Sequence, residues 1–272
     1  MVRSLWTGAT GMLAQQTSLD TIANNLANVN TTGFKSQSVE FKNLLYQTLQ
    51  TKTTSANGDT KPGSAQVGLG TRVSSLNTSF TQGAFFASES PTAFAIGGSG
   101  FFGVKGADGT TYYTRNGNFG WTLASGGGNM LATSDGYPVL DTSGNPIILD
   151  SKYVTSRITV TSDGQICYPD DKNNPQPIGK TIGLWQFNNP VGLNREGETL
   201  FKETAASGRP INEATDKNLK KSTVNQGYLE GSNVQVADEM VNMITTQRAY
   251  ELNSKVITTS DTMLEEANNL RR

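Results

Sequence analysis

The feature that most constrains this chain is a seven-residue repeat of apolar side chains at each of its two ends. The N-terminal repeat consists of Leu5, Met12, Leu19 and Leu26, beside a shorter row of Ile22 and Val29. Gly8 and Gln15 interrupt that second row. A repeat of seven keeps one seam of a helix facing a partner helix along its whole length. Residues 1–34 therefore predict one amphipathic helix that ends in a helix-stop signal. This helix must pack its apolar side against another part of the chain or another molecule.

The C-terminal end carries the matching pattern. Its first row consists of Val236, Met243, Tyr250, Ile257 and Leu264, and its second row of Ala249, Val256, Met263 and Leu270. Ser232 and Asn233 offer an N-cap, and neither proline nor glycine interrupts residues 234–272. A helix of roughly 35 residues is on the order of 50 Å long. The two terminal helices are therefore predicted to pair antiparallel.

Two paired helices leave apolar side chains uncovered. Five such side chains lie off the main rows, namely Leu13, Met240, Val241, Ile244 and Leu252. Burying one exposed leucine or methionine contributes ~1.5–3 kcal/mol, so several per chain favour association with further copies. The expected assembly interface comprises Leu5, Met12, Leu13, Leu19, Ile22, Leu26, Val29, Phe34, Val236, Met240, Met243, Ile244, Tyr250, Val256, Ile257, Met263 and Leu264.

The middle of the chain has a different character. Residues 36–50 are compatible with a short helix or an extended arm, and residues 51–70 are polar and glycine-rich, which is typical of a loop or loose hairpin. Residues 91–222 read as short strands with tight turns, including hairpins at Asp108-Gly109 and Asp163-Gly164 around a core that contains Trp185. The predicted fold class is α+β, with coiled-coil-like paired terminal helices and an irregular all-β central domain. The expected division is 1–35 helix and cap, 36–80 arm, 81–224 outer β domain and 225–272 C-terminal helix.

Composition argues against several classes of function. The chain has no histidine and one cysteine, Cys167, so the commonest general base and zinc ligand are absent from the sequence. Glu196 with Glu198 and Asp170 with Asp171 lie in loop-like stretches, where solvated charge is the usual explanation. We therefore predict no catalytic residue, metal or cofactor. A net charge of −1 points neither to nucleic acid nor to an anionic membrane, and no apolar run is long enough for membrane insertion. A secreted adhesin or binding module is an alternative, but it leaves the terminal repeats unexplained.

Three groups of motifs resemble one known family. The first is 23–35, with the motif residues Asn24, Asn25, Leu26, Ala27, Asn28, Gly33, Phe34 and Lys35. Asparagine is a poor helix former, and few helices carry so many. The second group is 81–83, 95–104 and 113–117, and the third is 225–234 and 240–251, which includes Gln247, Arg248, Ala249 and Tyr250. In these motifs and their order the chain resembles the axial proteins of the bacterial flagellar rod and hook.

The resemblance implies a mechanical function. The opening residues, the length and Leu44-Leu45-Tyr46-Gln47 are most similar to distal rod members, with proximal rod and short hook-type members as alternatives. The loops around Gly126 and Asp170 depart from that pattern. The family implies a helical homopolymer that forms a hollow shaft, with other rod proteins, the hook protein and ring proteins of the envelope as partners. It also implies a place in the basal body, spanning the periplasm, after export without a cleaved signal peptide.

Overall fold

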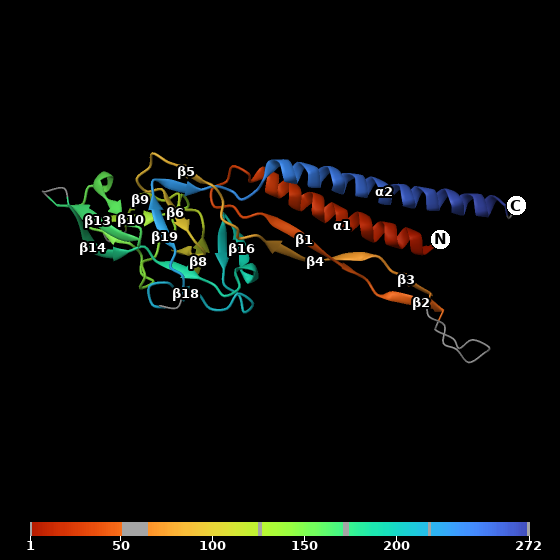
Figure 1. The fold of residues 1–272 in the computed structure, drawn as a ribbon, viewed down its shortest axis with the longest axis horizontal. Coiled ribbons are helices and arrows are strands. Elements are labelled where there is room, and N and C mark those ends of the chain that lie inside the picture. The colour runs from red at the N-terminus through yellow and green to blue at the C-terminus, as the bar shows by residue number, and fades with distance from the viewer. Residues whose placement is uncertain (1, 51–64, 125–126, 171–173, 217–218, 271–272) are drawn as a thin grey trace. The chain divides into compact units, whose positions relative to one another are not determined.

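The computed structural model describes residues 2–50, 65–124, 127–170, 174–216 and 219–270, which fall into two compact units. The first unit comprises Met1–Ala27, Gln37–Thr78 and Gln235–Arg272, and the second comprises Asn28–Ser36 and Ser79–Val234. Figure 1 shows both helices in the first unit and most of the strands in the second. The α+β class is therefore confirmed. The expected polar loop at 51–70 lies largely outside the described residues.

The first unit combines two helices with two antiparallel ribbons. Its elements are α1 (Val2–Ala27), β1 (Gln37–Asn43), β2 (Tyr46–Gln50), β3 (Ala65–Gly68), β4 (Thr71–Thr78) and α2 (Val236–Asn269). β1 pairs with β4, with Val39 opposite Leu76, and β2 pairs with β3. α1 packs against α2 and also against β1 and β4 (Figure 1). Of the two possibilities for residues 36–50, the extended arm is the one observed.

The helix α1 ends earlier than its apolar repeat predicts. It stops at Ala27, so Val29 lies beyond it in a turn where the Thr31 amide donates to the Asn28 carbonyl at 3.2 Å. The Thr31 hydroxyl also donates to Asn28 Oδ1 at 3.1 Å. Such local side-chain bonds give the backbone an alternative to helix. Gly33 has a φ of +70°, a left-handed conformation that glycine adopts without a side-chain penalty, and it closes the turn and not the helix itself.

The start of α2 also differs from the prediction. The N-cap residue is Gln235, whose side chain makes no capping hydrogen bond. Asn233 instead accepts from the Ser36 amide at 2.7 Å and donates to the Ser79 carbonyl at 2.9 Å. Residues 225–230, expected in the C-terminal helix, lie instead in strands β19 (Thr223–Gln226) and β20 (Tyr228–Glu230) of the second unit, with Gly227 in the turn between them. Their backbones pair with other strands there, which excludes a helix.

The second unit is built from short antiparallel strands. Its largest sheet has the order β16-β17-β8-β7-β15-β18, formed by Asn194–Gly197, Leu200–Lys202, Thr111–Thr114, Phe101–Lys105, Leu184–Gln186 and Ile211–Asn212. Two three-stranded sheets contain β9 (Gly120–Leu123), β10 (Asn129–Ala132) and β11 (Ile148–Leu149), and β12 (Thr159–Val160), β13 (Gln165–Pro169) and β14 (Pro175–Thr181). Two ribbons pair β19 with β6 (Phe94–Gly97) and β20 with β5 (Phe85–Ala87). Short 3-10 turns are at Thr155–Arg157 and Pro190–Gly192.

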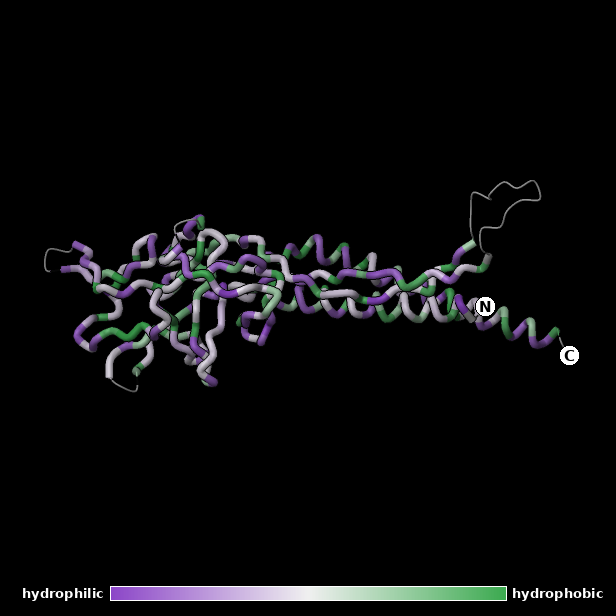
Figure 2. The backbone as a smooth tube through the Cα atoms, turned by 90° about the horizontal axis from the view of Figure 1, so that it is seen from below, coloured by the Kyte–Doolittle hydropathy of each residue, from purple (hydrophilic) through white to green (hydrophobic). Residues whose placement is uncertain are grey.

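Both predicted hairpins and the predicted core residue are present in this unit. β7 and β8 pair around Asp108-Gly109, and β12 and β13 pair around Asp163-Gly164. Trp185 is buried in the smaller of two apolar clusters in this unit. The larger cluster includes Phe102, Val104 and Ile147. In Figure 2 the helices of the first unit alternate between apolar and polar residues along their length. Neither of the described helices has a stretch apolar enough to cross a membrane.

Candidate assembly surface

The contacts between α1 and α2 include small and polar side chains. The hydroxyls of Ser4 and Ser260 lie 3.1 Å apart, and Asn25 Nδ2 donates to Glu239 Oε1 at 3.1 Å. Between these pairs α1 carries glycine, and a Cβ added to Gly11 would lie 2.8 Å from Asn253 Nδ2. Because α1 numbers rise as α2 numbers fall, the helices are antiparallel, as predicted.

The side of α1 that faces α2 is not the predicted leucine row. The contact positions, including Gly8, which lies against Ile257, follow a spacing of three and four residues and share one side of the helix. The row of Leu5, Met12, Leu19 and Leu26 lies beside that side and is half-buried. The glycines contribute to the difference, because the absence of a Cβ at Gly8 and Gly11 leaves room there for side chains of α2.

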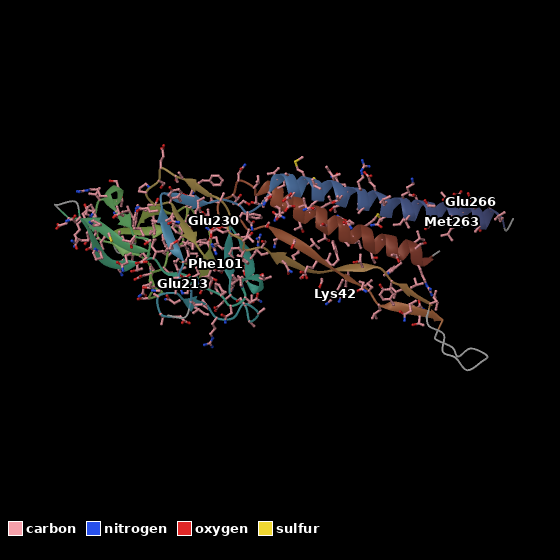
Figure 3. The ribbon with its side chains drawn as sticks, viewed as in Figure 1. Lys42, Phe101, Glu213, Glu230, Met263 and Glu266 are labelled. Carbon is pink, nitrogen blue, oxygen red and sulfur yellow. The ribbon has the colours of Figure 1, made fainter. Side chains whose placement is uncertain are left out.

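The helix α2 buries little of its apolar surface within one chain. Its only fully buried side chains, all 34 residues being described, are Thr246 and Ser260. Met243, Ile257 and Leu264 of the predicted first row are half-buried, whereas the second row is largely exposed, with Val256 at 45% and Met263 at 53%. Figure 3 labels Met263 near the C-terminal end of α2. A long helix normally covers an apolar stripe against its own core, which α2 does not do here.

Large apolar side chains are exposed on both helices. Relative exposures are Leu13 66%, Met240 52%, Val241 60%, Ile244 55% and Leu252 65%. A hollow of about 360 Å³ lies on this side of α2 and is lined by Leu252, Lys255, Val256, Thr259 and Ser260. We call the exposed side chains Met240, Val241, Ile244, Leu252, Val256 and Met263 the outer face of α2. Exposed large apolar side chains gathered on one element in this way are typical of interaction sites in soluble proteins.

The remaining predicted interface residues divide into two groups. Val236 and Tyr250 are exposed at 41% and 38%, so their side chains are accessible in a single chain. Ile22 and Phe34 are each only 7% exposed. Phe34 lies in the second unit with the Arg195 guanidinium 5.2 Å from its ring centroid. Ile22 and Phe34 are therefore already covered by their own chain.

A buried ionic cluster in the second unit was not anticipated from the sequence. Glu230 accepts from Lys35 Nζ at 2.6 Å and lies 3.4 Å from Arg115 Nη1, and all three side chains are essentially inaccessible to solvent. The Glu230 carboxylate also accepts from the Gly83 amide at 3.0 Å (Glu230 and Phe101, whose ring lies under Arg115, are labelled in Figure 3). The one available signal was that Lys35 and Glu230 both stand inside family motifs.

Burial governs the electrostatics of this cluster. Desolvation lowers the pKa of the Lys35 ammonium, and the Glu230 carboxylate opposes that change. Burial also lowers the pKa of Arg115, again against Glu230, and it lowers the pKa of Arg195 to about 10. Removing one partner of such a buried pair typically costs about 3–5 kcal/mol, because it leaves an uncompensated charge. The cluster therefore has a structural role, because it holds residue 35 and residue 230 together through a buried ion pair.

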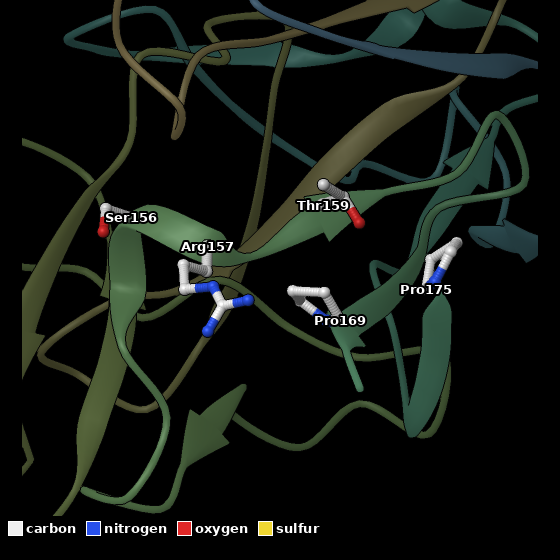
Figure 4. A pocket seen from close by; sticks show the side chains of 5 residues that line it. All are labelled: Ser156, Arg157, Thr159, Pro169 and Pro175. Carbon is white, nitrogen blue, oxygen red and sulfur yellow. The ribbon is translucent and has the colours of Figure 1, made fainter. Parts of the chain in front are cut away.

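The second unit also contains a surface hollow, shown in Figure 4. It is lined by Ser156, Arg157, Thr159, Pro169 and Pro175. Among the described residues of this lining, Arg157 is the one charged side chain, and its guanidinium stacks over Tyr168 at 5.8 Å from the ring centroid. The described part of the lining therefore contains no acid–base pair. Among the described residues, no group of three His, Cys, Asp or Glu side chains is placed to hold a metal ion.

Comparison with known proteins matches the whole chain in order. Residues 5–35 match the flagella basal body rod protein family, residues 95–168 the flagellar hook protein FlgE/F/G D1 domain, and residues 225–270 the flagellar basal body rod FlgEFG protein C-terminal region. The flagellar basal-body rod protein FlgG of Borreliella burgdorferi is 44% identical over 274 residues, covering both chains completely. FlgG of Bacillus subtilis is 39% identical, and the flagellar hook-basal body complex protein FlhP of the same organism is 34% identical, each over the full length of both chains.

A long helix from each end of the chain, a β-rich middle and these three matches define an axial protein of the bacterial flagellum. Proteins of this class are structural and are not enzymes. Within that class, the chain belongs to the FlgG family of flagellar basal-body rod proteins. The resemblance drawn from the sequence motifs is thereby confirmed.

Proposed function

We propose that this chain is the subunit of the distal rod and that its copies polymerise helically into a rigid hollow shaft. The shaft would enclose the export channel and transmit torque to the hook. The single observation that carries the proposal is the outer face of α2, where Met240, Val241, Ile244 and Leu252 are each more than half exposed. Burying such side chains contributes ~1.5–3 kcal/mol each, so neighbouring copies would stabilise the helices.

The domain organisation follows from the same proposal. The terminal helices would form an axial, coiled-coil-like layer, and the β-rich part would lie outside it. The side chains expected between copies include Leu5, Met12, Leu19, Leu26 and Val29, together with the outer face of α2. The ribbon of β2 and β3 exposes Tyr46 and Leu49 at 58% and 53%, which supports a second layer of contacts from the arm. Two layers of contacts would stiffen the shaft.

The partners and the location are likewise proposals. The ends of the shaft would join other rod proteins and the hook protein, and its sides would turn within the ring proteins of the envelope. The subunit would lie in the basal body, as part of the rod that spans the periplasm, and would be exported without a cleaved signal peptide. A distal position is favoured over a proximal or hook-type one because several relatives at 38–44% identity carry the FlgG name.

A pair of matched arginine substitutions tests this function. Leu252→Arg changes an exposed side chain of α2, and Leu123→Arg changes one in β9 that is 81% exposed. Neither change disturbs a buried contact, so both variants are expected to keep the wild-type circular dichroism spectrum. We expect Leu252→Arg to abolish filaments of the concentrated protein in electron micrographs and Leu123→Arg to retain them. Normal filaments from Leu252→Arg would contradict the proposal.

A further inference from the structure

The seam of α2 that faces α1 repeats every seven residues. Thr246, Asn253 and Ser260 form a polar row, beside the apolar row that ends in Ile257 and Leu264. Ser260 lies against Ser4, and Asn253 lies against Gly11. If α2 slid by seven residues, Asn253 would face Ser4 and Thr246 would face Gly11. Small and polar side chains would meet again at these two positions, so the contacts of Ser4 and Gly11 do not by themselves fix the register.

One contact between α1 and α2, that of Asn25 with Glu239, has no equivalent seven residues along α2. The Asn25 side chain is buried at 1% exposure, and its carboxamide is fully used. Its Nδ2 donates to the Gln37 carbonyl at 2.8 Å and to Glu239 Oε1 at 3.1 Å, while its Oδ1 accepts from the Gln37 amide at 2.9 Å. Gln37 is the first residue of β1 and pairs on its other side with Thr78. Asn25 therefore joins α1, the edge of the ribbon and α2 at one buried point.

We propose that the hydrogen bond between Asn25 and Glu239 sets the register of α2 against α1. A seven-residue slide moves Glu239 about 10 Å along the helix axis, out of reach of Asn25. The residue brought opposite Asn25 is then Thr246 in one direction and, in the other, residue 232, which precedes the helix. A neutral hydroxyl is a weaker acceptor than a carboxylate, and an empty position leaves a buried N–H unsatisfied. A single buried asparagine selects register in coiled coils for the same reason.

The register determines where the outer face of α2 is presented. A slide of seven residues displaces Leu252 and its neighbours by about 10 Å relative to α1 and the ribbon. In a shaft built from identical copies, that displacement would move the outer face of α2 away from the surface it contacts on the neighbouring copy. This consequence rests on the proposed function, whereas the register itself is a property of one chain and is tested separately.

The contact between Ser4 and Ser260 provides a register reporter at the far end of the helix pair. In a Cys167→Ser background, which removes the one native cysteine, Ser4→Cys with Ser260→Cys reports the observed register. Ser4→Cys with Asn253→Cys reports the slid register. Each protein is oxidised, intrachain disulfides are separated on a non-reducing gel, and peptide mass mapping identifies the linked positions. The readout is the ratio of the 4–260 disulfide yield to the 4–253 disulfide yield.

Isosteric substitutions identify the bond responsible for that ratio. Asn25→Asp keeps the size of the side chain and the Oδ1 acceptor. It removes both N–H donors and places a second carboxylate next to that of Glu239. We expect it to lower the ratio by about tenfold, as expected for the loss of a hydrogen bond to a charged group. Glu239→Gln retains an Oε1 acceptor but loses its charge, so it should lower the ratio less than Asn25→Asp does. The double variant Asn25→Asp/Glu239→Gln should recover the ratio, because the glutamine amide donates to the new carboxylate.

Two further variants keep the test decisive. Gln16→Glu makes the same amide-to-carboxylate change on the exposed side of α1 and should leave the ratio unchanged. Glu239→Leu leaves the bonds between Asn25 and Gln37 intact and should lower the ratio as Asn25→Asp does, even if the latter variant folds poorly. The proposal is overturned if both Asn25→Asp and Glu239→Leu keep the wild-type ratio, or if the unaltered seam forms no 4–260 disulfide. If the variants change the disulfide ratio as expected but the protein never forms filaments, only the proposed function is refuted.

Discussion

At the scale of single residues, Glu230 joins parts of the second unit that are distant in sequence. Its carboxylate contacts Lys35, Arg115 and the Gly83 amide, and its carbonyl accepts from the Gly33 amide at 2.8 Å. Position 33 requires glycine, because a Cβ there would lie only 2.5 Å from the Asn116 backbone nitrogen. One buried carboxylate thereby fixes the segment at 28–36 against the strand that precedes α2.

Two buried groups of this unit, Lys35 and Tyr113, are expected to change the stability in opposite directions at alkaline pH. Burial lowers the pKa of Lys35 below its ordinary 10.5, so between the two values the unfolded chain holds a proton that the folded chain has released. The free energy of unfolding therefore increases as pH rises toward 10.5, by about 1.4 kcal/mol for each pKa unit of difference. Burial raises the pKa of Tyr113 above its ordinary 10.0, so the stability it contributes below pH 10 is lost above it.

Urea unfolding at pH 7, 8, 9, 10 and 11 measures both effects. Lys35→Met should be less stable than the wild type at pH 7 and should lack the increase below pH 10. Tyr113→Phe should retain that increase and show a smaller decrease above pH 10. Identical pH profiles for the wild type and Lys35→Met would show that the pKa of Lys35 is the same in the folded and the unfolded chain.

At the scale of elements, the close approach of α1 and α2 depends on the glycines of α1. A Cβ added to Gly8 would lie 3.0 Å from Ile257 Cγ1, which is tight but can be relieved by a small side-chain shift. Glycine also lowers helix stability by ~1 kcal/mol relative to alanine. Close packing and helix propensity therefore oppose one another at this position, and the packing requirement explains why the seam contains glycine.

Two substitutions at Gly8 separate these effects. Gly8→Ala should change the free energy of unfolding by less than about 1 kcal/mol, since better propensity offsets the tight contact. Gly8→Leu should destabilise the helix pair by about 1–3 kcal/mol, because the larger side chain forces the helices apart. Thermal unfolding followed at 222 nm gives both values. Equal stability of Gly8→Leu and the wild type would show that the helices do not depend on this approach.

At the scale of the whole molecule, the two units differ in how completely each buries its apolar residues. The second unit has continuous cores with side chains such as Ile96 and Phe102 fully buried. The first unit buries Ala14 and Ile22 but exposes most of the large apolar side chains of α2. Stability within one chain is therefore concentrated in the β-rich unit, and the helical unit has more to gain from neighbouring copies.

Deletion of residues 236–272 tests this asymmetry. The shortened chain should retain a cooperative unfolding transition and a β-rich circular dichroism spectrum, because the second unit keeps its cores. It should sediment as a monomer at concentrations at which the full chain forms filaments. Filaments from the shortened chain would mean that α2 is not the polymerising element.

The sequence by itself determined the class of protein, the two terminal helices, the hairpins at 108–109 and 163–164 and the apolar side chains left over on α2. Each of these depends on local periodicity, turn chemistry or motif, which are properties of neighbouring residues. The side of α1 that meets α2, the end of α1 at Ala27, the strands at 223–230 and the Glu230 cluster were decided by tertiary structure. Lys35 and Glu230 are 195 positions apart, and their pairing depends on which backbones lie side by side. The seven-residue repeats likewise predicted that the helices pair, whereas the glycines and Asn25 decided through close approach and burial how they pair.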